Sequence, residues 1–284
     1  MKNLGVAQRG VALIAVLWLV AAMSLIITGI VQAVRSEART VGLQRQALLA
    51  NAWADAAILL ALQNMHAQKK EPKNTVQFIP VQFGGRISEV SVRPLNGLID
   101  INNATVVLLA DLYRHAGAMS PDAAQALAQA TLEARESRSA KGLTARFEAT
   151  EDLLRVPGMT YGLYAKINSL ITADLQAGSG RVNALAAPVG VLQVLTGGDI
   201  ARAAVLANRR DADPNLMDTS FLNPAQIDMA SSSNLRLQIR VDLPDGGSLQ
   251  KTWHIFWSTD PRSGLPWRVI GTQQSMQRVA QPGN

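Results

Sequence analysis

The chain has 284 residues, of which 48% are hydrophobic and 17% charged, so it can form a packed core and is not a disordered chain. It contains no cysteine, which excludes disulfides, thiolate metal sites and cysteine nucleophiles. The formal net charge is +6, but no run of five or more Lys or Arg occurs, so we favour a scattered basic surface over one that binds nucleic acid.

An uncharged and almost wholly apolar stretch runs from Gly10 to Val34. As a helix it would be about 36 Å long, enough to cross a hydrocarbon layer of about 30 Å. It exceeds the apolar region of a cleaved secretory signal, which is about 7–15 residues. We therefore predict a membrane span. Lys2 and Arg9 before it indicate a cytoplasmic N-terminus, although Arg35 beyond it opposes that orientation.

The helical pattern continues beyond the span without a Pro or a Gly pair. Leu49, Trp53, Ala56 and Leu60 recur at the spacing of one helix face. The sequence therefore predicts one helix from about Val11 to about Met65, with an amphipathic second half that packs on a folded domain.

Strands are predicted on both sides of a long middle region. The segments TVQFIPVQF and RISEVSVRP flank Gly84-Gly85 and predict a hairpin. Apolar residues alternate from Leu235 to Leu243, which predicts a half-buried strand. A turn at 245–247, a return strand through Trp253, Ile255 and Trp257, a last strand over 267–270 and a frayed polar tail are expected to follow.

The middle region is rich in alanine and is predicted to be helical, with an internal repeat. Ala104–Leu112 is similar to Ala187–Leu195, and each segment follows a glycine and an apolar residue before an asparagine. A helix led by an aspartate follows each segment. The predicted helix N-caps are Asn102, Thr105, Ser120 and Thr150.

The N-terminal residues resemble a family signal. A short basic leader that ends in Arg9-Gly10, followed at once by VALIAVLW, is similar to the signal of type IV pilins and pseudopilins. The resemblance implies that a prepilin peptidase cuts between Gly10 and Val11 on the cytoplasmic face and leaves the apolar helix attached, with methylation of the new N-terminus.

Position five of the expected mature chain is Ala15, where most pilins carry glutamate. In the family that carboxylate pairs inside the membrane with the terminal amine of the subunit ahead. A subunit at the filament tip has no such partner, and a buried carboxylate without one is costly. Together with EDLLRVPGMTYGLYAKI at 151–167, Ala15 makes the chain similar to the K class of minor pseudopilins (GspK) of type II secretion systems.

This resemblance implies an α+β fold: a long N-terminal helix, half transmembrane and half amphipathic, packed on an antiparallel sheet, with a large all-α insert. The expected division is a leader at 1–10, a transmembrane part at 11–34, an α+β pseudopilin domain at 35–103 and 231–284, and a helical insert at 104–230. The implied location is the bacterial inner membrane, single-pass, with the globular part in the periplasm.

The resemblance also implies partners and a role. The expected partners are other minor pseudopilins of the I and J classes, through the N-terminal helix, together with the prepilin peptidase and the secretion platform. The subunit would initiate or cap the pseudopilus that exports folded proteins across the outer membrane.

The alternative is a competence-type or type IV pilus minor pilin that contacts DNA. The segment VPGMT at 156–160 resembles a helix-hairpin-helix turn, in which backbone N–H groups hold a phosphate. Thr160 stands where the DNA-binding version has a second glycine, and Glu148, Glu151 and Asp152 lie nearby. We favour a tight turn between packed helices and expect no nucleic-acid partner.

Catalysis and metal binding have little support in the sequence. His66, His115 and His254 lie far apart in no metal-binding spacing, and no GxSxG, P-loop or GxGxxG motif occurs, so no enzymatic activity is expected. Some K-class relatives bind calcium, and the densest acidic loop holds Asp211, Asp213 and Asp218. We favour an ordinary turn there over a calcium site, because Arg209 and Arg210 offset the charge.

Overall fold

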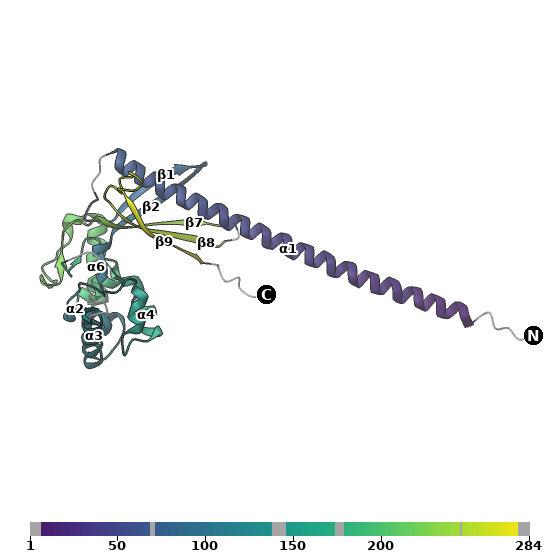
Figure 1. Cartoon of the computed structure of the whole chain (residues 1–284), viewed down its shortest axis with the longest axis horizontal. Coiled ribbons are helices and arrows are strands. Elements are labelled where there is room, and N and C mark those ends of the chain that lie inside the picture. The colour runs from purple at the N-terminus through teal and green to yellow at the C-terminus, as the bar shows by residue number, and fades with distance from the viewer. Residues whose placement is uncertain (1–6, 69–71, 138–145, 174–178, 245, 278–284) are drawn as a thin grey trace, which may run out of the picture.

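The computed structural model describes residues 7–68, 72–137, 146–173, 179–244 and 246–277. One long helix, α1 (Ala7–Ala67), extends far beyond the rest of the molecule at its N-terminal end (Figure 1). Its 61 residues correspond to a length of about 90 Å. The predicted single helix is confirmed, and it begins four residues before Val11, so the expected cleavage point lies within helical backbone.

The C-terminal half of α1 packs on one face of a five-stranded antiparallel sheet of order β1-β2-β7-β8-β9, and together they form what we call the sheet lobe. The strands are β1 (Gln77–Phe83), β2 (Arg86–Pro94), β7 (Asn234–Asp242), β8 (Ser248–Phe256) and β9 (Arg268–Gln277). The predicted hairpin is confirmed, and Gly84 and Gly85 at its turn have φ of 59° and 75°, the left-handed values that suit glycine.

The strand predicted from alternation is β7, and its Leu235, Leu237, Ile239 and Val241 are buried against α1. The last strand differs from the prediction. β9 continues to Gln277, so the first part of the expected frayed tail is paired with β8 over its whole length. The sequence pattern missed this part of the strand because its side chains do not alternate between apolar and polar, whereas its backbone pairs with β8. Asp245 in the predicted turn and the tail from residue 278 lie outside the described residues.

The core face of α1 differs from the prediction by one residue. Leu49 is 60% exposed, Ala56 is half-buried, and Trp53 and Leu60 are partly buried against the core. The buried residues are Ala50, Ala54, Ala57, Ile58, Ala61, Leu62 and Met65. The four alanines among them let the helix axis come close to the sheet, a preference that counting only large apolar residues misses.

The remaining segments form a helical lobe with its own core at the end of the sheet away from the free half of α1 (Figure 1). Its helices are α2 (Val106–Asp111), α3 (Pro121–Glu136), α4 (Tyr161–Ile167), α5 (Val189–Leu195) and α6 (Ile200–Ala212). Short helical turns are η1 (Leu95–Gly97), η2 (Leu112–Ala116), η3 (Thr150–Arg155), η4 (Asn168–Leu170) and η5 (Pro214–Leu216).

The predicted repeat appears as two similar units. In the first, β3 (Ile99–Asp100) leads to α2 and α3, and the unit closes where β4 (Ile171–Thr172) pairs with β3 in parallel. In the second, β5 (Val182–Asn183) leads to α5 and α6, and β6 (Ile227–Asp228) pairs with β5 in parallel. The two halves of the repeat thus take equivalent places in the lobe.

Two of the four predicted N-caps are confirmed. The hydroxyls of Thr105 and Ser120 accept hydrogen bonds from backbone N–H groups at the start of α2 and α3. Thr150 lies one residue inside η3, whose N-cap is Ala149. Asn102 caps no helix: its side-chain amide exchanges two hydrogen bonds of 2.9 Å with the backbone of Phe147. The Asn102 prediction failed because a distant segment binds its side chain, and the Thr150 prediction missed the cap by one residue.

We expect Gly180→Ala to destabilise the helical lobe by about 3 kcal/mol, which combines overpacking with a strained backbone. Gly180 has φ of 68°, and an added Cβ would lie 2.0 Å from the carbonyl oxygen of Asn103. The matched control is Gly197→Ala, where φ is 69° but no atom lies within 4 Å. Denaturant unfolding of the full chain in detergent measures both, and equal losses would show that backbone conformation alone matters.

Candidate assembly interface on the N-terminal helix

The free half of α1 is apolar and exposed. The structure has one helix apolar and long enough to cross a membrane among its described residues; its most apolar window has a mean hydropathy of 2.6 and no buried residue. Leu13, Trp18, Leu25 and Ile30 are among its many exposed large side chains. Such a surface is stable only in lipid or against other apolar helices.

The two hydroxyl side chains in this half bond within the helix. The hydroxyls of Ser24 and Thr28 donate to the carbonyls of Val20 and Ser24, four residues earlier, at 2.8 and 2.7 Å. Each hydroxyl hydrogen is therefore satisfied within the helix, as the hydrocarbon layer requires. No Asp, Glu, Lys or Arg lies between Leu13 and Val34, and Ala15 leaves the span without the carboxylate that most pilins carry.

An apolar stripe continues on the outer side of α1 beyond the span. We define the outer stripe as Val34, Val41, Leu48 and Leu59, which are all exposed. At 100° per residue, steps of seven and eleven residues return to within about 20° of the same direction. The sheet-facing residues, such as Ala54 and Ala61, lie on the other side of the helix. The stripe is therefore available to another helix while α1 holds its own sheet.

Two polar residues of α1, Asn51 and Asp55, bind the sheet lobe. Asp55 contacts two residues of β8 through its Oδ1. It accepts a hydrogen bond from the Trp253 indole N–H at 3.0 Å and forms an ion pair with the Lys251 ammonium at 3.2 Å. Lys251 also donates to Asn51 Oδ1 at 2.7 Å. These contacts join positions about 200 residues apart, so no local sequence signal could have revealed them.

The three acidic residues considered for calcium each bond to groups close to them in the chain. Asp211 pairs with Arg210 at 2.8 Å, and Asp213 accepts the Asn215 N–H at 2.9 Å. Asp218 accepts the Ser220 N–H at 2.9 Å, and bonds from Ser220 lower its pKa. Across the described residues no group of three or more His, Asp or Glu is placed to hold a metal ion. Asp213 and Asp218 thus close local turns, as favoured from the sequence, and whether calcium binds there stays untested.

The VPGMT turn joins η3 to α4, and within it the Met159 N–H donates to the Val156 carbonyl at 3.0 Å. Gly158 has φ of 91°, and the Thr160 hydroxyl accepts the Leu163 N–H at 3.2 Å. That N–H is one of the groups with which a helix N-terminus would hold a phosphate. Arg155 pairs with Asp152 at 3.2 Å. The geometry is that of a turn between packed helices.

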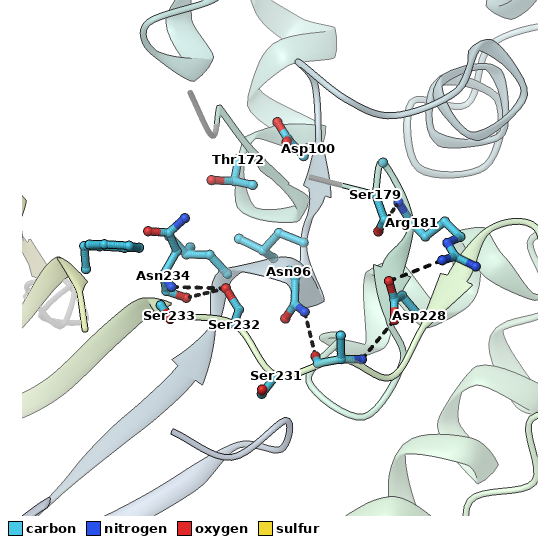
Figure 2. Close-up of a pocket in the computed structure, with 15 residues that line it drawn as sticks. Asn96, Asp100, Thr172, Ser179, Arg181, Asp228, Ser231, Ser232, Ser233 and Asn234 are labelled. Carbon is cyan, nitrogen blue, oxygen red and sulfur yellow. Dashed lines mark hydrogen bonds and ion pairs between the residues drawn. The ribbon is translucent and has the colours of Figure 1, made fainter. Parts of the chain in front are cut away.

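A cleft of about 340 Å³ lies where the two lobes meet (Figure 2). The chain's own contacts bridge its walls: Arg181 pairs with Asp228 at 3.6 Å, and the Asn96 amide donates to the Ala230 carbonyl at 2.9 Å. The Ala230 N–H is the main cause of a lowered pKa of Asp228. The lining residues include serines and the carboxylates of Asp100 and Asp228.

The histidines occupy separate environments. His66 is exposed in the last turn of α1, and His115 lies in η2, beyond α2, in the helical lobe. His254 is on β8, where its Nε2 accepts a hydrogen bond from Arg236 Nε at 3.1 Å. Burial, and then the positive charge of Arg236, lower the pKa of His254 from 6.5 to about 4. His254 is therefore a neutral acceptor in the folded protein at neutral pH.

We expect this histidine to make the fold sensitive to acid. Because its folded pKa is below the unfolded value, its contribution is complete above pH 6.5 and is lost as the pH falls from 6.5 towards 4. Allowing for partial exposure, the loss is about 1–2 kcal/mol. His254→Gln keeps an acceptor for Arg236 without titrating, so unfolding measured from pH 7 to pH 4 should fall less steeply. Parallel curves would contradict the assignment.

No protein-family model matches the chain, and no curated protein matches it. A comparison with solved structures finds a chain of the GspK-GspI-GspJ complex from the enterotoxigenic Escherichia coli type 2 secretion system. That chain is 17% identical, the match covers 85% of this chain and 98% of that one, and the TM-score is 0.45. The complex contains the class that the sequence resembles.

Proposed function

We propose that this protein is a membrane-anchored minor pseudopilin of the K class, acting at the tip of a type II secretion pseudopilus. One observation carries the proposal: α1 is a single helix whose first half is exposed and apolar. Its second half packs on the antiparallel sheet and forms the core of the sheet lobe. A helix built in this way can stay in the membrane and be drawn into a helical assembly without unfolding its head.

The proposed pathway follows from the order of the parts. The prepilin peptidase removes residues 1–10, and the 11–34 helix stays in the inner membrane with the head in the periplasm. The exposed apolar face of α1, including the outer stripe, packs against the helices of I-class and J-class pseudopilins. Because residue 15 is alanine, the span has no carboxylate that must pair with the terminal amine of a subunit ahead. The helical lobe, at the end away from the membrane half of α1, hinders another subunit from stacking above (Figure 1).

The first test is the N-terminus and intact mass of the protein made with and without a prepilin peptidase. We expect a peptidase-dependent form that begins at Val11 and carries a methyl group, and an uncut chain without the enzyme. Gly10→Val should abolish cleavage, because the enzyme recognises the small residue before the cut. The control Gly29→Val changes a glycine of the same helix with no atom near its Cβ position and should be cut normally. An enzyme-independent cut near Ala33 would overturn the proposal.

A further inference from the structure

A row of basic side chains crosses three neighbouring strands on the face of the sheet opposite α1. Arg93 on β2 lies directly opposite Arg236 on β7, and Arg236 lies opposite His254 on β8. Their neighbours Val92 and Leu237 point to the other face, into the core. Two like charges in directly opposed positions of an antiparallel pair are destabilising, so this arrangement needs a compensating group.

A further guanidinium reaches the same place from the helical lobe. Arg210 on α6 is 7% exposed, and it donates to the carbonyl of Ala187 and to Asp211 Oδ1. Arg93 donates to the preceding carbonyl, that of Ala186, at 2.5 Å. Guanidiniums from the two lobes thus hold consecutive carbonyls of one connecting segment.

The charge at this junction is not balanced by the described residues. Burial lowers the pKa of Arg93, and the charges of Arg210 and Arg236 lower it further, while only Asp211 acts in the opposite direction. Asp211 is 65% exposed and pairs directly with Arg210. Within the described part of the chain neither Arg93 nor Arg236 has an ion pair with a carboxylate. A partly buried cation without an anionic partner is costly even when it is hydrogen-bonded, and a bound anion would offset that cost.

The two guanidiniums also border a space that could receive such an anion. Arg93 and Arg210 line a cleft of about 350 Å³. The other lining residues are mostly apolar and are Thr75, Val76, Phe78, Leu185, Asp211 and Pro214. Planar guanidinium forks match the two oxygens of a carboxylate, and an apolar wall suits a peptide better than a hydrated ion.

We propose that this cleft binds the carboxylate of an acidic peptide segment, flanked by apolar residues, from a partner protein. Its place at the junction of the lobes, away from the membrane half of α1, argues against a lipid headgroup as the source (Figure 1). That the partner belongs to the secretion assembly rests on the proposed function. Peptide binding at the cleft does not rest on it, so a failed cleavage test would leave the binding proposal standing, and a failed binding test would leave the proposed function standing.

The test uses the full chain in detergent micelles at constant ionic strength. The probes are acetyl-Leu-Glu-Leu-amide, its Gln counterpart and inorganic phosphate, and the readout is the thermal unfolding midpoint against probe concentration. We expect a saturable rise with the Glu peptide and none with the Gln peptide. Arg93→Gln should weaken binding at least tenfold. Arg93→Lys keeps the charge but loses the fork and should weaken it less.

The matched control is Arg240→Gln, which removes the same charge from an exposed position of β7 and should bind as the unchanged protein does. Equal responses to the Glu and Gln peptides, or equal binding by Arg93→Gln and Arg240→Gln, would overturn the proposal. An Arg93-dependent response to phosphate without any response to the Glu peptide would also overturn it and would indicate a site for a free anion.

Discussion

Asp55→Ala is expected to destabilise the sheet lobe by about 3 kcal/mol, because it leaves the ammonium of Lys251 buried without its carboxylate. Lys251 is 10% exposed, and Asp55 also accepts the indole N–H of Trp253. Removing one member of a buried ion pair lowers the stability by more than the intact pair contributes, since the remaining charge stays buried and unpaired. Denaturant unfolding of the full chain, followed by tryptophan fluorescence, measures the loss.

The control for this prediction is Lys251→Met, which removes the buried charge and fills the same space. We expect it to be close to neutral and expect the double variant, Asp55→Ala with Lys251→Met, to recover most of the loss. The double-mutant cycle therefore separates the cost of an unpaired ammonium from the cost of a lost contact. Single effects that simply add would show that Asp55 stabilises the lobe through Trp253 instead.

Leu48→Glu is expected to leave the head folded and to reduce assembly with partner pseudopilins at least tenfold. Leu48 is 70% exposed in the centre of the outer stripe, so its replacement changes folding by no more than about 0.5 kcal/mol. In a helix–helix contact the same change buries a carboxylate against apolar side chains, which costs well over the 1.4 kcal/mol of a tenfold effect. Co-purification of tagged partners from the membrane measures it.

The matched control is Leu43→Glu, the same replacement five residues earlier. Leu43 is 36% exposed and lies about 140° around the helix from Leu48, outside the stripe. It should keep normal assembly. If both variants assemble normally, the stripe is not an interface; if both fail equally, the added charge near the membrane is responsible, whichever face carries it.

The sequence predicted the parts of the fold that depend on local patterns. The long apolar helix, the Gly84-Gly85 hairpin and the alternating strand from Leu235 are all present, because each is specified by neighbouring residues. The buried face of α1 was displaced by one position, since alanines such as Ala54 and Ala57 gave a weaker signal than the large residues beside them. The repeat was readable because both units bury the same periodic pattern.

Features that depend on distant pairing could not be predicted. The opposition of Arg93 and Arg236 exists only because β2 pairs with β7, across more than one hundred intervening residues. The contacts of Asp55 with β8 have the same origin. For the candidate interface, the span and Ala15 were visible in the sequence, whereas the outer stripe required knowledge of which side of α1 the sheet covers.

The two borders of the sheet differ in their capacity for further pairing. β1 carries Pro80 at its centre, which has no N–H to donate, whereas β9 runs for ten residues without a proline and with Arg268 as its one charge. Two copies that joined through β9 would expose only their proline-bearing borders. Because Pro80 cannot donate a hydrogen bond, β1 is the poorer edge for adding a strand, and β9 is the better one.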